Sequence, residues 1–309
     1  RFAAIAPCAG WISFDTFGGG GRFPTDTELG KVFNRAKSPS DTLGLKGNYS
    51  RLAIFALHGD ADSTVPVSEP RRMREELKGH PAFYWFEQPG GGHWYDTDPE
   101  PGSDCVDYSG IFNLFARTQR PLPQETKEID FTTASPGVSG KHAWVTVQQQ
   151  VEPFNFSNVK GKVRPLDRTF ELTTTNVQAL DISLVALPAQ REEREKVTVK
   201  IDGQAVVFLR PTSVETPLNL VRKGDKWIAS DTAVPSSEKN SVRSGGFKDI
   251  FKNEVILVYG TSGDTAMKDW AKAKDRFDHE QFFYRGIGQF LVIPDTAFDQ
   301  TRFKDRNVL

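Results

Sequence analysis

Over residues 1–120, short apolar runs bounded by glycine and proline alternate with charged, amphipathic segments. The apolar runs have the length of strands, and the segments between them have helical periodicity. This alternation is typical of a parallel α/β sheet, because parallel strands are joined by crossover helices. The expected strands are FAAIAPCAG (2–10), LAIFALHGD (52–60) and AFYWFEQPG (82–90), and the expected helices are VSEPRRMREELKG (67–79) and SGIFNLFARTQR (109–120).

Residues 15–50, between the first two expected strands, are rich in Gly, Pro, Asp and Ser. We interpret them as an excursion over the surface rather than as part of the core. The excursion contains FGGGGR (17–22), which lacks the following Lys-Ser/Thr and the preceding strand of a phosphate-binding loop. A flexible loop is therefore the better interpretation of this run.

Between residues 125 and 232 the pattern changes to short β-type runs with polar alternation, and helical periodicity nearly disappears. This predicts a β-rich, sandwich-like domain. The Asp-Gly pair in KIDGQAV predicts a hairpin, because a type I′ turn needs positive φ at both central residues. The runs are EIDFTTASP, HAWVTVQQQ, RTFELTTTN, ALDISLVAL, KVTVKIDGQAVVFL and DKWIAS.

From residue 245 the α/β pattern returns, as a strand in EVILVYGT, a helix through TAMKDWAKAKDRFDHEQFFYRG and a strand in QFLVIPDTAF. A unit of this size is incomplete, because its sheet needs neighbours to cover it. We therefore expect three domains, with an α/β domain at 1–122, a β-rich domain at 123–235 and a partial α/β unit at 236–309.

The charge balance excludes partners that are recruited by bulk charge. Lys plus Arg (39) nearly equals Asp plus Glu (40), so we expect neither nucleic acid nor an anionic membrane surface as a partner. Apolar runs are too short for a membrane helix, which needs roughly 18 to 20 residues. The two cysteines, Cys8 and Cys105, fit no metal-site spacing and leave open both a disulfide between them and the compartment.

Two acidic side chains and one histidine stand at positions where chemistry is expected. Asp60 and Asp62 follow the apolar strand at 52–60, and His93 follows the next strand within PGGGHWYD. In an open parallel sheet the loops at the carboxyl ends of strands meet at one edge, where ligands bind. Asp62 would there hold the imidazole of His93 by its Nδ1 hydrogen and stabilise the imidazolium formed during proton transfer.

A strand, HGxxD, a Val-Pro turn, a helix, a strand and GGGHW together resemble the carboxyl-terminal half of an α/β-hydrolase catalytic domain, closest to the prolyl oligopeptidase (S9) peptidases and related esterases. His58, Gly59 and Asp62 match the acid motif of that family, and His93 matches its base. RFAAIAPCAGW is similar to the segment that follows the nucleophile helix, and KAKDRFDHEQFFYRG is similar to accessory regions of large bacterial members.

The resemblance implies a partial α/β-hydrolase fold, no cofactor, and a peptide or ester as substrate. It also implies a bacterial protein in an extracytoplasmic place, secreted or periplasmic. It leaves open whether the chain forms a homo-oligomer, and whether its activity is that of a peptidase or of an esterase.

The family's nucleophile elbow G-x-S-x-G is missing from this sequence. Ser139 in GVSGK and Ser262 in GTSGD both come after His93, whereas the family order is Ser, acid, His, so neither is expected to be the nucleophile. RFAAIAPCAG at the start does not look like a natural terminus. We therefore expect a fragment of a larger serine hydrolase, inactive alone, whose nucleophile precedes Arg1.

Alternative interpretations apply to each of these features. If it is not a catalytic base, His93 among glycines and aromatics is a structural histidine. If it is not the triad acid, Asp62 is a helix N-cap or Asx-turn residue. Trp94 is the best candidate for lining the substrate site, although packing is the simpler role for it. The alternative for the whole chain is a non-catalytic, hydrolase-like scaffold whose β-rich module binds glycans or protein.

No zinc-site spacing is present in the sequence, and we predict no metal. The acidic stretch DTDPEPGSD offers Asp96, Asp98 and Glu100 to a calcium ion, but a solvated acidic loop is the better interpretation.

Overall fold

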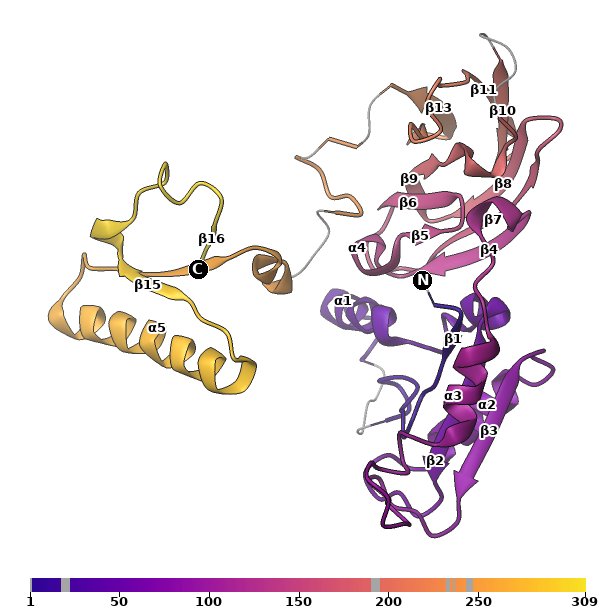
Figure 1. Cartoon of the computed structure of the whole chain (residues 1–309). Coiled ribbons are helices and arrows are strands. Elements are labelled where there is room, and N and C mark those ends of the chain that lie inside the picture. Colours follow the sequence, from indigo (N-terminus) through magenta and orange to yellow (C-terminus); the bar gives the residue numbers. More distant parts are fainter. Residues whose placement is uncertain (1, 18–22, 190–194, 232–233, 236, 243–246) are drawn as a thin grey trace. The chain divides into compact units, whose positions relative to one another are not determined.

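The computed structural model describes residues 2–17, 23–189, 195–231, 234–235, 237–242 and 247–309. It divides into two compact units, Arg1–Ser244 and Gly245–Leu309 (Figure 1). The first unit holds both domains that the sequence predicts for 1–122 and 123–235, and the boundary between them stays a prediction. Most of the glycine run at 17–22 lies outside the described residues.

The first part of unit 1 is a parallel three-stranded sheet, as the alternation of strands and helices predicts. Its central strand is buried along its whole length, which explains the uninterrupted apolar run in the sequence. Buried side chains from the sheet pack with Ile111 and Leu114 of the helix that follows it. The sheet order is β1 (Ala4–Ile5), β2 (Ala53–Gly59), β3 (Phe83–Gln88), and the helices are α2 (Ser68–Glu76) and α3 (Ser109–Arg117).

The excursion between β1 and β2 contains helical structure that the sequence interpretation did not predict. Its described part includes α1 (Glu28–Lys37), which begins where the Thr27 side chain accepts a hydrogen bond from the Gly30 N–H. Two 3₁₀ helices follow, η1 (Ser38–Ser40) and η2 (Lys46–Arg51), and no residue of either is buried. The excursion therefore has regular structure, yet it adds little to the core.

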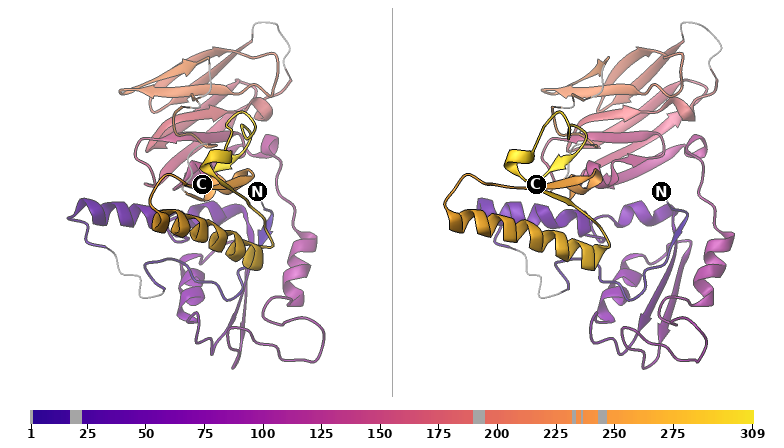
Figure 2. Two further views of the ribbon diagram at one scale, coloured as in Figure 1. Left: turned by 90° about the vertical axis from the view of Figure 1, so that its left-hand side faces the viewer. Right: turned by 60° about the vertical axis from the view of Figure 1, so that its left-hand side comes forward.

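The second part of unit 1 is a pair of five-stranded sheets around one core, which agrees with the β-rich prediction. Fully buried side chains from both sheets, such as Val159, Phe170, Leu180 and Leu220, join in a single cluster with Trp144. Figures 1 and 2 show these strands at one end of the unit and the parallel sheet at the other. One sheet has the order β11-β10-β8-β7-β4 and the other β13-β12-β9-β6-β5.

The strands of the first of these sheets are β4 (Glu128–Thr133), β7 (Ser157–Arg164), β8 (Thr169–Thr175), β10 (Lys196–Ile201) and β11 (Gln204–Leu209). Those of the second are β5 (Lys141–His142), β6 (Val145–Gln150), β9 (Val177–Ile182), β12 (Leu218–Lys223) and β13 (Lys226–Ser230). Short helices α4 (Pro136–Ser139), η3 (Pro123–Glu125) and η4 (Leu184–Ala186) lie between strands.

The hairpin predicted from Asp-Gly is present. Ile201 pairs with Gln204 across the turn, and Asp202 and Gly203 have φ of 48° and 80°. The Asp202 carboxylate also accepts hydrogen bonds from Thr174 on β8 and from the Trp227 indole on β13. The turn residue therefore connects strands of both sheets.

Unit 2 is the strand–helix–strand arrangement that the sequence predicts. The central strand β14 (Val255–Tyr259) pairs in parallel with β15 (Leu291–Pro294) and with β16 (Asn307–Val308). The long helix α5 (Thr265–Gly286) begins where Asp264 accepts a hydrogen bond from Met267 N–H. The unit also has the 3₁₀ helices η5 (Phe247–Lys252) and η6 (Asp295–Ala297).

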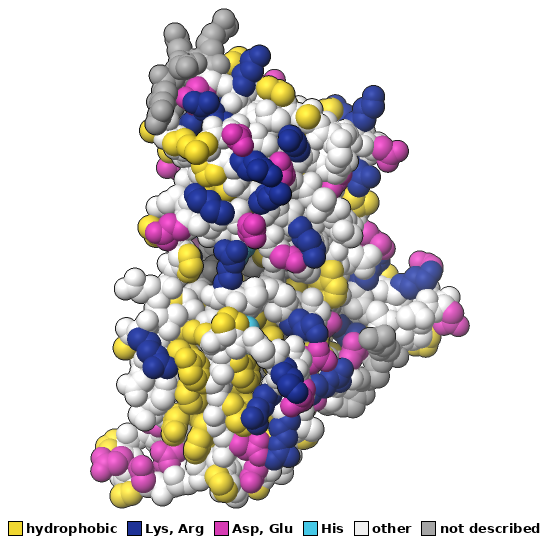
Figure 3. Space-filling model, turned by 90° about the vertical axis from the view of Figure 1, so that its right-hand side faces the viewer, with side chains coloured by type: hydrophobic (Ala, Val, Ile, Leu, Met, Phe, Trp, Pro, Cys, Tyr) yellow, Lys and Arg dark blue, Asp and Glu magenta, His cyan; other side chains and the backbone are white. Residues whose placement is uncertain are grey.

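Hydrophobic side chains are exposed on the face of unit 1 that carries α3 and β3 (Figure 3). Tyr84 is 40% exposed, Phe112 54% and Phe115 43%.

No helix among the described residues is both long and apolar enough to cross a membrane.

Candidate active site

The loops that follow β2 and β3 are held together by their backbones. Because the two strands are parallel neighbours, both loops leave the same edge of the sheet. Asp60 N–H donates to the Gln88 carbonyl at 3.0 Å and Ala61 N–H donates to the Gly91 carbonyl at 3.0 Å. Gly90 N–H donates to the Asp60 carboxylate at 2.6 Å. The loop with the acid and the loop with the histidine therefore form one hydrogen-bonded unit.

Two glycines permit this close approach. A Cβ at position 59 would lie 2.2 Å from the Gly91 carbonyl oxygen, which no side chain tolerates. Gly90 has φ of 68°, in the left-handed region that favours glycine. The chain thus turns after β3 through Gly90, a residue that adopts positive φ without strain.

Asp62 uses its two carboxylate oxygens for different partners. Oδ1 accepts hydrogen bonds from the backbone N–H groups of Thr64 and Val65, both at 2.8 Å. Oδ2 accepts a hydrogen bond from His93 Nδ1 at 2.8 Å. The Asx-turn role and the histidine-orienting role, weighed as alternatives from the sequence, are both filled by this one side chain.

The environment of Asp62 favours its ionised form. Its side chain is fully buried, and burial by itself raises the pKa. Hydrogen bonds from His93 and from the backbone of Val65 and Thr64 outweigh burial and hold the pKa of Asp62 below its ordinary value. Asp62 is therefore a carboxylate at neutral pH.

His93 is placed to transfer a proton. Its Nδ1 faces Asp62, so beside a carboxylate this nitrogen carries the hydrogen and Nε2 has a free lone pair. The side chain is 19% exposed, which leaves the ring reachable. This arrangement can accept a proton at Nε2 while Asp62 stabilises the charge that forms.

Trp94 lies beside His93 without being part of a core. The two rings meet edge to face with centroids 4.9 Å apart, and Trp94 is 77% exposed. Its exposure argues against the packing role that the sequence left open. Its role in contacting substrate stays a prediction.

His58 orders the turn that carries Asp62. It is buried at the end of β2, and its Nε2 lies 2.9 Å from the Val65 carbonyl oxygen and 3.2 Å from Asp62 Oδ2. A hydrogen on Nε2 therefore serves the turn and the carboxylate together. Nδ1 has no hydrogen-bond partner among the described residues.

Glu69 is a supporting residue that the sequence interpretation missed. It is buried on α2, and its carboxylate accepts hydrogen bonds from Ile12 N–H at 3.1 Å and the Thr16 hydroxyl at 2.6 Å. This ties the segment after β1 to the helix that follows the Asp62 turn. The only sequence signal was an acidic residue in the first turn of that helix.

The acidic stretch after His93 forms a different carboxylate group from the one expected. Oxygens of Asp96, Asp98 and Asp104 lie within 4.8 Å of one another, and Glu100 is not in the group. Hydrogen bonds from Thr97 to Asp104 lower the pKa of that carboxyl and satisfy it within the loop. A solvated acidic loop stays the simpler interpretation.

The two cysteines are free thiols in this structure. Cys8 and Cys105 both pack in the core of the parallel-sheet part. Burial raises the pKa of Cys8. Among the described residues, no contact brings the thiol of Cys8 or Cys105 to His93 as a nucleophile.

The two serines with glycine neighbours lie in other elements. Ser139 belongs to α4 in the second part of unit 1, and Ser262 belongs to unit 2, ahead of α5. Neither stands on a loop that follows β1, β2 or β3.

In the comparisons with known proteins, no protein-family model matches this chain and no curated protein matches it.

Proposed function

We propose that Asp62 and His93 are the acid and the base of a serine-hydrolase triad in a partial α/β-hydrolase domain of the prolyl oligopeptidase type. The observation that carries the proposal is the 2.8 Å hydrogen bond from His93 Nδ1 to a buried Asp62 that backbone amides hold in place. A carboxylate that fixes the imidazole tautomer is the arrangement that such triads use.

Three further features support this assignment over a structural histidine. The acid and the base follow adjacent parallel strands in the order acid, then histidine, as in α/β-hydrolases. The His93 ring stays reachable, and only one of its nitrogens faces Asp62. Finally, Asp62 is ionised at neutral pH, so it can stabilise an imidazolium.

In the proposed reaction a serine attacks the carbonyl carbon of an ester or peptide bond. His93 Nε2 takes the serine proton as the new C–O bond forms, and later gives it to the departing alkoxide or amine. Water then attacks the acyl carbon and gives a proton to His93 Nε2, the bond from the acyl carbon to the serine oxygen breaks, and the serine oxygen takes that proton. The serine and the amides of the oxyanion hole come, in this proposal, from residues outside these 309.

The test is covalent labelling of the full-length gene product with a fluorophosphonate probe. We expect His93→Ala to slow labelling by about 10³-fold or more, and Asp62→Asn by a similar factor, because each removes activation of the nucleophile. Asp60→Asn is the matched control, since Asp60 lies in the same turn without contacting His93, and an Asn side-chain oxygen can still accept the Gly90 N–H. The 309-residue chain alone should not react.

Equal labelling of wild-type protein and His93→Ala would contradict the triad. An elbow residue other than Ser, Cys or Asp, with no labelling of the wild type, would instead favour the non-catalytic scaffold.

A further inference from the structure

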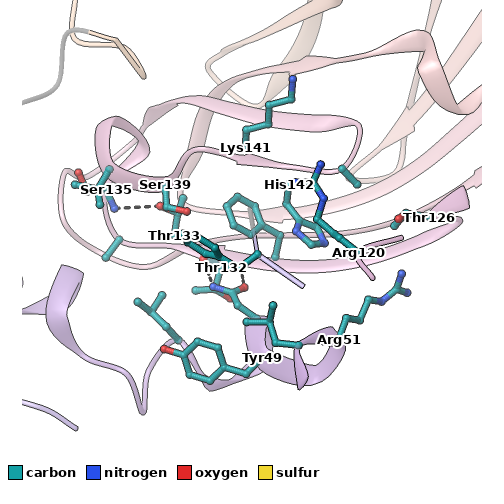
Figure 4. A pocket seen from close by; sticks show the side chains of 18 of the residues that line it. Tyr49, Arg51, Arg120, Thr126, Thr132, Thr133, Ser135, Ser139, Lys141 and His142 are labelled. Carbon is teal, nitrogen blue, oxygen red and sulfur yellow. Dashed lines mark hydrogen bonds between the residues drawn. The ribbon is translucent and has the colours of Figure 1, made fainter. Parts of the chain in front are cut away.

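A cavity of about 730 Å³ lies between the two parts of unit 1, away from Asp62 and His93. Figure 4 shows Tyr49 and Arg51 on its parallel-sheet side, and Ser135, Ser139, Lys141 and His142 on its sandwich side. Its volume is in the range of sites that hold small organic ligands.

The two walls of the cavity are joined by specific hydrogen bonds. The Asn48 side chain donates to the Thr132 carbonyl at 2.7 Å and accepts from Thr132 N–H at 2.9 Å. Asn48 is on η2 and Thr132 is on β4, so this pair fixes the distance between the walls. The cavity is therefore a built feature of the unit.

The charged side chains that line the cavity are all basic. Arg51, Arg120 and Lys141 contribute three cations, and no Asp or Glu is among the lining residues. No ion pair of these three cations is found within the described part of the chain. With no carboxylate among the lining residues, these cations favour an anionic occupant, while the nearby Asp41 acts on Tyr49 of the same wall.

His142 is a half-buried residue in the wall of the cavity. Its ring stacks on Phe131 with centroids 5.4 Å apart. Burial, and after it the charge of Arg51, lowers the pKa of His142. Position 142 therefore lies within the field of a cavity cation.

The remaining lining is apolar with a few hydroxyl groups. Thr132, Ser139 and Tyr49, which carry hydroxyl groups, are among the lining residues. An occupant would thus meet cations on some walls and an apolar surface on others. The apolar walls come from Phe2, Pro39, Leu45, Leu52, Phe131 and Val138.

We propose that this cavity binds a small amphipathic anion, a carboxylate carried on an aromatic or alkyl body. The carboxylate is favoured by the charges of Arg51, Arg120 and Lys141, and the body lies on the apolar walls. This inference does not depend on the proposed hydrolase activity, because no cavity residue contacts Asp62 or His93.

The test is titration of the protein with 4-phenylbutyrate, followed by the imidazole resonances of His142, which His142→Gln assigns. We expect saturable binding and a rise in the His142 pKa, because a nearby anion favours the imidazolium. The isosteric amide, 4-phenylbutyramide, should bind about tenfold more weakly or worse, since it lacks the charge.

The double variant Arg51→Gln/Arg120→Gln should weaken binding of 4-phenylbutyrate by about tenfold or more. Lys226→Gln is the matched control for loss of a cation. It is exposed on β13, at the opposite edge of the sheet that carries Lys141, and should bind like wild type. Both variants change exposed residues, so circular dichroism should show an unaltered fold.

Equal binding of acid and amide, or undiminished binding by the double variant, would overturn the proposal. Inorganic phosphate that binds as tightly as 4-phenylbutyrate would also overturn it, because the apolar walls would then contribute nothing. The His93→Ala variant should bind 4-phenylbutyrate normally, which separates this outcome from that of the triad experiment.

Discussion

In the candidate active site, where the loops after β2 and β3 meet, Asp62 shows how tightly one residue is constrained by its contacts. One oxygen holds the turn by two backbone N–H groups and the other holds His93. Because both tasks need an acceptor, the position requires a carboxylate rather than an amide. The spacing HGxxD predicted the residue, but it could not show that turn and base share it.

Replacing Asp62 by Asn should lower stability in a pH-dependent way. The native pKa of Asp62 lies below its ordinary value of 3.8, so its contribution is present above that value and is lost as pH falls through the native pKa. We expect Asp62→Asn to cost about 1–2 kcal/mol at pH 7. Urea unfolding of both proteins at pH 7 and near pH 3 checks this. A difference that stays constant between the two pH values would contradict it.

Gly59→Ala should be destabilising although position 59 does not need positive φ. The added methyl group would collide with the Gly91 carbonyl oxygen, and that carbonyl is held by Ala61 N–H. We expect a loss of about 2–3 kcal/mol and slower probe labelling of the full-length protein. Gly47→Ala, with no atom within 4 Å of its added Cβ, is the control. Matching stabilities for the two variants would disprove the close approach.

At the scale of elements, what the sequence predicted depended on how clearly each pattern alternates. The parallel strands, α5 and the Asp202-Gly203 hairpin followed from apolar runs and one turn signal. Strand β7 was missed, since Gly161 and lysines interrupt its pattern and only Ser157, Val159 and Val163 are buried. Helix α1 was missed because it is short, mostly exposed and preceded by glycines and prolines.

The hairpin between β10 and β11 should depend on its turn glycine. Gly203 has φ of 80°, a conformation that costs a residue with a Cβ about 1–2 kcal/mol. We expect Gly203→Ala to lower the free energy of unfolding by that amount, measured by urea denaturation. Gly203→Asn should lose less, because Asn tolerates the left-handed region better than Ala. Equal losses from Ala and Asn would point to a cause other than φ.

On the scale of the whole molecule, the excursion between β1 and β2 connects the two parts of unit 1. Besides the Asn48–Thr132 pair, Arg35 on α1 forms an ion pair with Glu152, and the Phe156 ring lies against Gly44. A sequence read segment by segment shows a polar excursion. Its contacts with residues about 85 to 120 positions away depend on three-dimensional packing, which periodicity does not encode.

Asn48→Ala should weaken the junction of the two parts of unit 1. It removes two hydrogen bonds and leaves the Thr132 backbone unpaired there, so we expect a loss of about 1–2 kcal/mol in the free energy of unfolding. Asn34→Ala is the control, because it also removes a pair of side-chain hydrogen bonds, but within the excursion itself. Hydrogen exchange should quicken on β4 in Asn48→Ala alone. Unchanged exchange there would mean that other contacts hold the junction.

For the contact between Asp62 and His93, the sequence could predict which residues take part and their order along the chain. The sequence placed Asp62 and His93 on neighbouring loops, and the structure brings them into contact. It could not supply Glu69, or the cavity between the two parts, because both depend on contacts between distant segments.

The backbone hydrogen bonds between the Asp62 loop and the His93 loop also restrict their lengths. Asp60 N–H reaches Gln88, Ala61 N–H reaches Gly91, and Gly90 N–H returns to Asp60. One residue inserted between Gln88 and Gly90 would displace both the Gly90 and the Gly91 partner and carry the imidazole away from its carboxylate. Homologues that keep the acid and the base should therefore vary in the long excursion and the acidic stretch, while the count of residues in these two turns stays constant.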